Sequence, residues 1–170
     1  GVTVGTLNFI RGITFSDDGK KMFLPGTSPK NKIVQFNLNP GFDLSTASES
    51  GVEIDKDDRD QITAPYSIRF NNDGSKMFFV QLGGELVEFS LGTNFDITSA
   101  SAEDNTSLTK DETLDGGNTT GFAFNTDGTK LFTVDNASDE IDQYILTTGF
   151  DIDTMSYDQS IDISDNTSSP

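Results

Sequence analysis

Short apolar runs with a period of two recur along the whole chain, separated by clusters of Gly, Pro, Asn and Asp. Near the start, Ile13 and Phe15 form one such run, Met22 and Leu24 a second, and the segment KIVQFNL a third. Because successive side chains of a strand point to opposite faces, this alternation predicts short strands. No segment shows the 3.6-residue period of an amphipathic helix. The pattern therefore predicts an all-β protein.

A nine-residue phrase adds a longer period to this pattern. It occurs three times, as FSDDGKKMF (15–23), FNNDGSKMF (70–78) and FNTDGTKLF (124–132). The glycines of the three copies are 55 and 54 residues apart. An internal repeat of this length indicates a supersecondary unit that stacks on its own copies.

Each repeat is expected to hold four antiparallel strands. The Asp-Gly pairs predict tight hairpins in which Gly19, Gly74 and Gly128 take a positive φ, so a valine at these positions should damage folding. A third strand is predicted at KIVQFNL, ELVEFSL and EIDQYIL, and a fourth at SGVEID, TSLTK and SIDIS. The chain is therefore predicted to consist of three four-stranded repeats.

Four-stranded repeats of about this length are typical of β-propeller blades. The pattern FSxDGxKMF, followed by IxQYxL and FDLSTAS, resembles the propeller repeats of the TolB-like and YVTN surface-layer type, and most closely the tandem repeats of marine bacterial and phage proteins. The resemblance covers essentially the whole chain. It implies a fold rather than an activity, since such repeats occur in binding, scaffold and enzymatic proteins alike.

The repeats predict the boundaries of the blades. Residues 1–11 are expected to complete a preceding or partner blade, followed by blades at 12–66, 67–120 and 121–170. Propellers close with about four to eight blades. Three blades therefore predict either a segment of a longer chain, a ring assembled from two three-bladed chains, or an open stack.

Composition removes several classes of function. The chain has 28 acidic against 11 basic residues and a net charge of −17, so we expect no nucleic-acid partner. It has no Cys and no His, which excludes disulfides, thiol nucleophiles and the commonest general base. No run approaches the roughly 18 apolar residues of a membrane-spanning helix, so we expect no membrane insertion.

One acidic segment is a candidate metal site. DKDDRD offers Asp55, Asp57, Asp58 and Asp60, and alternate carboxylates can hold Ca²⁺, the only cofactor that the sequence suggests. The segment departs from the EF-hand pattern, because Asp60 stands at the glycine position and Tyr66 at the final glutamate position. A calcium site and a solvated loop between blades both stay open.

Three further acids recur once in each repeat, directly after a phenylalanine. Asp43, Asp96 and Asp151 have this position in GFDL, NFDI and GFDI. A residue that serves every blade is expected to serve the turn of that blade, its side chain accepting backbone N–H bonds. We therefore predict structural roles for these acids, as for the hairpin glycines.

For catalysis, a pair of carboxylates is the only conventional choice, and 28 acids do not single out a pair. Polar positions found in one repeat only would favour an enzyme if they faced the central channel. Arg11, Arg69 and Asp135 are such positions.

The main interpretation is a non-enzymatic structural or binding propeller. It would act by protein–protein contacts or adhesion in an extracellular, cell-surface or virion assembly, with further blades, other copies of itself or neighbouring structural proteins as partners. The alternatives are a glycan-binding lectin-like propeller and a carboxylate-dependent propeller hydrolase or lyase. The sequence assigns no catalytic or cofactor-binding residue.

Overall fold

Three antiparallel sheets of four strands make up the described part of the chain. The computed structural model describes residues 7, 9–27, 31–55, 57, 58, 60–107 and 118–164. The first sheet contains β1 (Thr14–Phe15), β2 (Lys21–Gly26), β3 (Lys32–Asn37) and β4 (Ser48–Asp55). The second contains β5 (Pro65–Phe70), β6 (Lys76–Gln81), β7 (Glu85–Leu91) and β8 (Ala100–Ser107). The third contains β9 (Thr119–Phe124), β10 (Lys130–Asp135), β11 (Glu140–Leu146) and β12 (Met155–Asp162).

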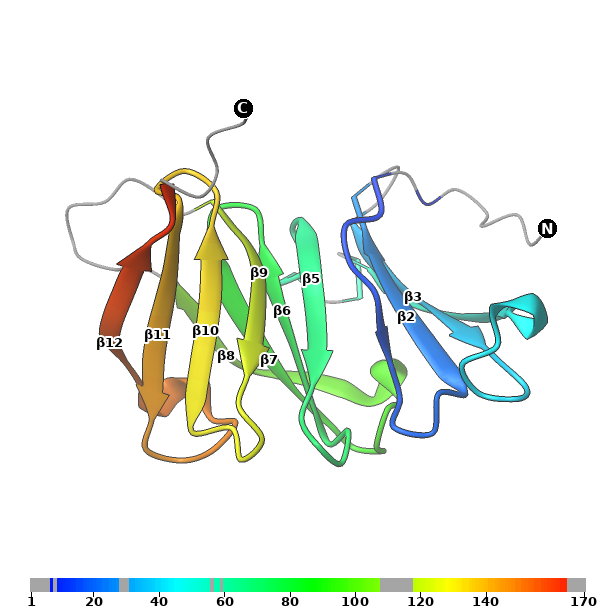
Figure 1. Ribbon diagram of the computed structural model, residues 1–170. Coiled ribbons are helices and arrows are strands. Elements are labelled where there is room, and N and C mark those ends of the chain that lie inside the picture. Colours follow the sequence, from blue (N-terminus) through cyan, green and yellow to red (C-terminus); the bar gives the residue numbers. More distant parts are fainter. Residues whose placement is uncertain are drawn as a thin grey trace.

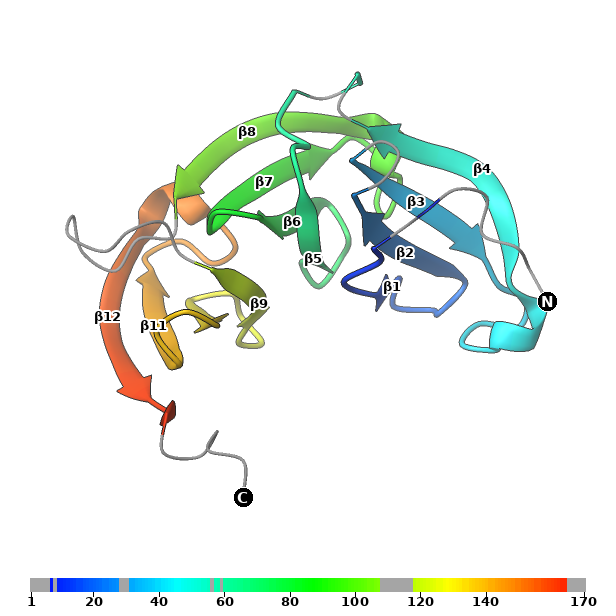
Figure 2. The ribbon, with the colours of Figure 1, turned by 90° about the horizontal axis from the view of Figure 1, so that it is seen from above.

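The sheets stand side by side along an arc. Within each sheet, every strand pairs with the next one in sequence. Figure 1 shows the arc from the side, and Figure 2 shows β1, β5 and β9 toward its concave side with β4, β8 and β12 on its convex side. The predicted all-β fold of three four-stranded antiparallel repeats is confirmed.

The outermost strands begin earlier than their sequence suggests. A short 3-10 turn leads into each of them: η1 (Leu44–Thr46), η2 (Ile97–Ser99) and η3 (Ile152–Thr154). β8 starts at Ala100 and β12 at Met155, whereas the predicted fourth strands were TSLTK and SIDIS. These strands border solvent on the convex side, so they need few apolar residues and carry little apolar alternation.

The predicted blade boundaries stay a prediction, and two strands begin close to them. β5 begins two residues before residue 67, and β9 begins two residues before residue 121. Most of the segment 1–11 lies outside the described residues.

The apolar core lies between neighbouring sheets. We call the contact between the first and second sheets the first seam, and that between the second and third sheets the second seam. The first seam buries side chains of both sheets, including Phe23, Ile33, Ile68, Met77, Phe79 and Phe89. The second seam buries Phe78, Val80, Leu86, Phe122, Leu131, Tyr144, Leu146 and Ile152. Burying each large side chain contributes about 1.5 to 3 kcal/mol, so the seams hold the blades together.

The two ends of the arc carry exposed apolar side chains. Ile13, Phe42 and Leu44 are exposed on the first sheet and its turn, and Val134, Ile145 and Ile161 on the third. Monomeric proteins rarely leave large contiguous apolar patches in water.

Among the described residues, no helix is long and apolar enough to cross a membrane.

Candidate functional site

The hairpin glycines lie under aromatic rings. Gly19, Gly74 and Gly128 have φ values of 67°, 72° and 72°. A Cβ atom added to any of them would meet a phenylalanine ring at 2.2 to 2.3 Å, namely the ring of Phe42, Phe95 and Phe150 in turn. These positions therefore exclude a side chain twice, by backbone conformation and by contact.

The acids after these phenylalanines cap the 3-10 turns in two of the three blades. The Asp43 carboxylate accepts from the Ser45 backbone N–H at 2.9 Å, and Asp96 accepts from Thr98 in the same way at 3.0 Å. Asp151 makes no such side-chain cap. In its blade, the Thr154 hydroxyl donates to the Asp151 carbonyl at 2.8 Å.

The DKDDRD segment follows β4 and forms a turn. Oδ1 of Asp55 accepts from the backbone N–H groups of Asp57 at 2.8 Å and Asp58 at 3.3 Å. Oδ2 of Asp58 accepts from the Asp55 backbone N–H at 3.3 Å. In the described part of the chain, no three acidic side chains are grouped so that they could hold a metal ion. Calcium binding by this segment, Asp60 included, stays a prediction.

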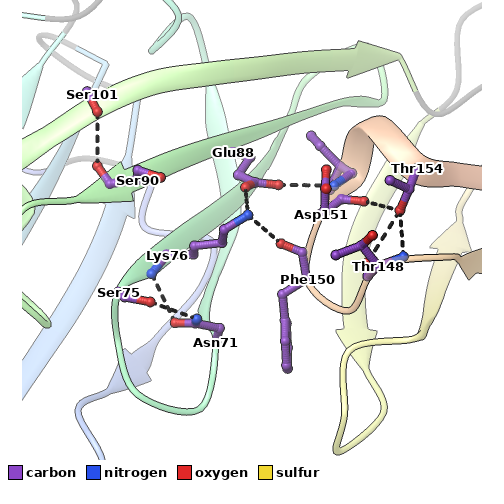
Figure 3. Close-up of polar contacts among 11 residues, drawn as sticks. Asn71, Ser75, Lys76, Glu88, Ser90, Ser101, Thr148, Phe150, Asp151 and Thr154 are labelled. Carbon is purple, nitrogen blue, oxygen red and sulfur yellow. Dashed lines mark hydrogen bonds and ion pairs between the residues drawn. The ribbon is translucent and has the colours of Figure 1, made fainter.

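A buried polar junction joins the second and third sheets (Figure 3). Glu88 on β7 is 1% exposed, forms an ion pair with Lys76 on β6, and accepts from the Ile152 backbone N–H at 3.0 Å. Lys76 also donates to the Phe150 carbonyl at 2.8 Å. Burial raises the pKa of Glu88 above its ordinary value, against the opposing effect of Lys76. Both carboxylate oxygens of Glu88 have partners, one in its own blade and one in the neighbouring blade, so this junction is a structural contact.

The third sheet carries polar side chains where the other sheets are apolar. Thr133 stands at the position of Leu24 and Phe79, counted from the hairpin glycine of each repeat. Asp142 stands at the position of Val34 and Val87, the third residue of its strand. Thr133 is two residues from Leu131, and Asp142 is two residues from Tyr144. Residues two apart on a strand share a face, and Leu131 and Tyr144 belong to the second seam, so both polar side chains face this seam. They are 2% and 6% exposed.

Thr133, Asp142 and Asp135 lie together on this face. Thr133 is directly opposite Asp142 in the register of β10 and β11, and Asp135 is opposite Glu140. Asp135 is therefore a diagonal neighbour of Asp142, a relation that places Cα atoms about 7 to 8 Å apart. Oγ1 of Thr133 is buried and has no hydrogen-bond partner in the described part of the chain.

The electrostatics of Tyr144 reflect these acids. Burial, followed by electrostatic interactions with Asp142, Tyr157 and Asp135, raises the pKa of the Tyr144 phenol above its ordinary value. Asp135 also has a local role, because its Oδ1 accepts from the backbone N–H groups of Ala137 at 2.7 Å and Ser138 at 3.0 Å. These two bonds fix the Asp135 carboxyl at the end of β10, near Asp142.

The three repeat-specific positions singled out in the sequence are separated by the fold. Asp135 joins the polar group of the third sheet. Arg11 stacks over the ring of Tyr66, with its guanidinium carbon 4.2 Å from the ring centroid. Arg69 lies on the innermost strand β5, near the hairpin end. The sequence analysis did not single out Thr133 and Asp142. A position-by-position comparison of the three repeats does show both as polar residues at otherwise apolar positions.

Solved structures of known proteins share this fold. No family model and no curated protein matches the sequence. A putative 6-phosphogluconolactonase from Bacteroides uniformis is similar at 17% identity and a TM-score of 0.60, covering 89% of this chain and 40% of that one. A periplasmic gluconolactonase of Pseudomonas aeruginosa is similar at 12% identity and a TM-score of 0.59, covering 91% of this chain and 41% of that one. The Cps50 (Swd1) β-propeller domain of Myceliophteria thermophila is similar at 11% identity and a TM-score of 0.57, covering 90% of this chain and 43% of that one.

The chain folds as three blades of a β-propeller. It spans about two fifths of the length of these similar propellers, which agrees with the expectation that it is part of a larger propeller. At these identities, the likeness establishes the fold alone. The finer resemblance to TolB-like and YVTN repeats, the extracellular or virion location, and self-association stay predictions.

The comparisons correct the main functional interpretation. The sequence favoured a non-enzymatic structural propeller, but several of the similar solved structures are named as lactonases. The comparisons contradict the non-enzymatic interpretation and agree better with the hydrolase alternative, which stays a proposal. The sequence favoured a structural role because most of its recognisable residues are repeated in every blade and serve the fold. The few residues that differ between blades are less apparent in the sequence.

Proposed function

We propose that the propeller to which these blades belong is a hydrolase that opens a sugar lactone, with Asp142 as its general base. The observation that carries the proposal is the replacement of two core residues by Thr133 and Asp142 in one blade only. Burying a carboxylate and a hydroxyl where valine and leucine or phenylalanine would pack lowers stability. Polar groups retained at such a cost are candidates for function.

The reaction needs one water and one base. Asp142 removes a proton from the water as its oxygen attacks the lactone carbonyl carbon. The ring C–O bond then breaks, the leaving alkoxide takes the proton that Asp142 removed from the water, and the product is a hydroxy acid. The Thr133 hydroxyl, directly across the strands from Asp142, can hydrogen-bond the attacking water and hold it in place.

Asp135 supplies a second carboxyl beside Asp142 on the same face of the third sheet. The diagonal relation of Asp135 and Asp142 gives a backbone spacing of about 7 to 8 Å. Asp135 ends β10 and Asp142 is the third residue of β11, so both lie near the rim of the sheet.

Asp142→Asn tests the catalytic role in the intact protein. We expect hydrolysis of D-glucono-1,5-lactone, followed by the acid released at constant pH, to fall by about 10²- to 10⁴-fold. Asp153→Asn removes an exposed carboxylate of the same blade and is expected to leave the rate unchanged. Absence of lactone hydrolysis in the parent protein, or an undiminished rate in Asp142→Asn, would overturn the proposal.

A second variant separates catalysis from folding. Thr133→Leu with Asp142→Val restores the residue types of the other blades, Leu24 and Val87. Exchanging both buried polar groups for the apolar residue types that other blades have at these positions should raise the free energy of unfolding by about 1 to 3 kcal/mol while abolishing hydrolysis. A double variant that is less stable and still active would show that the pair serves the fold.

A further inference from the structure

A pocket of about 320 Å³ opens between the second and third sheets at the hairpin end of their innermost strands. Arg69 and Phe70 of β5, with Asn72 beyond them, line one side, and residues 123–126 line the other. The Nδ2 group of Asn72 donates to the Thr126 carbonyl at 2.8 Å, which ties the two hairpins together. The pocket thus has defined walls from two blades.

Arg69 is specific to the second blade. Thr14 and Ala123 stand at its position in the other two repeats, so the fold does not need an arginine there. The side chain is half-buried, and burial lowers the pKa of its guanidinium. A half-buried cation without a counter-charge is unfavourable, which calls for an explanation outside the fold.

The donors of Arg69 are mostly unused by the protein. In the described part of the chain, its one hydrogen bond runs from Nη1 to the adjacent Ile68 carbonyl, at 2.7 Å. It forms none of the ion pairs found among the described residues, although the chain has 28 acids. A guanidinium has five N–H donors and binds carboxylate or phosphate oxygens in pairs.

The walls of the pocket suit the body of a small molecule. Phe124 and Phe150 contribute aromatic surface, and rings of this kind pack against apolar or sugar faces. The volume is within the usual range for small-molecule sites.

We propose that this pocket binds a small anionic molecule, whose carboxylate or phosphate pairs with Arg69 and whose body lies against Phe124 and Phe150. The inference does not rest on the proposed hydrolysis. Residues 123–126 adjoin the hairpin between β9 and β10, whereas Asp142 lies close to the turn between β10 and β11, at the opposite end of the third sheet. Anion binding at the Arg69 pocket can therefore be measured independently of hydrolysis at Asp142.

Titration calorimetry on the intact protein tests the site with three probes. D-gluconate carries a carboxylate, glucose 6-phosphate a phosphate, and glucose neither. We expect saturable binding of one or both anions and at least tenfold weaker binding of glucose, because hydrogen bonds to charged groups are the stronger ones. The first two probes distinguish which anion the site takes.

Two variants assign the binding to this pocket. Arg69→Ala introduces the residue that the third blade already has at this position, so the variant should fold, and we expect it to weaken anion binding roughly tenfold or more. Arg69→Lys keeps the positive charge but lacks the paired donors of the guanidinium, and we expect it to bind anions more weakly than the parent and more tightly than Arg69→Ala. Lys20→Ala removes an exposed cation elsewhere and should bind like the parent. Absence of anion binding in the parent, or unchanged binding in a folded Arg69→Ala protein, would overturn the inference.

Discussion

At the scale of single residues, the repeated phrase encodes a contact between a glycine and an aromatic ring. Phe42, Phe95 and Phe150 all have positive φ values, between 55° and 61°. This conformation is rare for bulky residues and costs about 1 to 2 kcal/mol. It is offset by the ring, which lies on the hairpin glycine, and by a hydrogen bond such as that from the Phe95 backbone N–H to the Gly74 carbonyl at 2.8 Å.

Gly74→Ala should be markedly more harmful than Gly51→Ala. The two glycines have nearly equal φ values of 72° and 73°, but a Cβ on Gly74 would meet the Phe95 ring at 2.3 Å and a Cβ on Gly51 meets nothing within 4 Å. We expect a loss of about 1 kcal/mol at Gly51 and more than about 3 kcal/mol at Gly74, measured by urea unfolding. Equal losses would show that the ring contact contributes nothing.

At the scale of elements, a lysine at the start of each second strand connects one blade to the next. Lys21 donates to the Phe95 carbonyl and Lys76 to the Phe150 carbonyl, both at 2.8 Å. Lys130 is the equivalent residue of the third blade and is exposed at the end of the arc. The second seam adds the buried Glu88, where the first and third blades have Gln35 and Gln143.

The two partners of the second seam should respond unequally to substitution. Lys76→Met leaves the buried Glu88 carboxylate without its counter-charge, and we expect a loss of about 3 kcal/mol. Glu88→Gln leaves Lys76 bonded to the Phe150 carbonyl and reproduces the first seam, where Gln35 accompanies Lys21, so we expect a loss of about 1 kcal/mol or less. Guanidinium unfolding of both variants measures the difference, and similar losses would contradict this account.

At the scale of the whole molecule, two electrostatic effects oppose each other. The net charge of −17 produces self-repulsion at neutral pH. Hydrogen bonds from a side chain or backbone N–H two residues later lower the pKa of five turn carboxyls below the ordinary 3.8: Asp18, Asp43, Asp73, Asp96 and Asp127. Acidification is therefore expected first to reduce the repulsion between negative charges, and then to protonate the turn carboxyls and weaken their hydrogen bonds.

The melting temperature should pass through a maximum at about pH 4 to 5. A lowered pKa contributes stability that is present above the unfolded value of 3.8 and is lost as the pH falls through the folded pKa. The raised pKa of Glu88 has the opposite sign, since its contribution is present below the unfolded value of 4.5 and is lost as the pH rises. Calorimetric melting between pH 7 and 3 tests this, and a melting temperature that only rises on acidification would refute the role of the turn carboxyls.

The sequence by itself determined the fold class, the number of strands in each repeat and the hairpin glycines. These features are local and occur three times, so alternation, turn chemistry and period all agree. The starts of β8 and β12 were missed, because strands on the convex side carry little apolar alternation. The sequence also displayed the departures of the third repeat, Thr133 and Asp142, at otherwise apolar positions.

Only the tertiary structure decided which of these residues meet. The pairing of β10 with β11 places Thr133 opposite Asp142 and makes Asp135 their neighbour, and the packing of two sheets buries all three. The stacking of blades likewise turns Arg69 into the wall of a pocket whose other side lies more than 50 residues away in the chain. Such contacts join residues through register and packing, which a one-dimensional pattern does not contain.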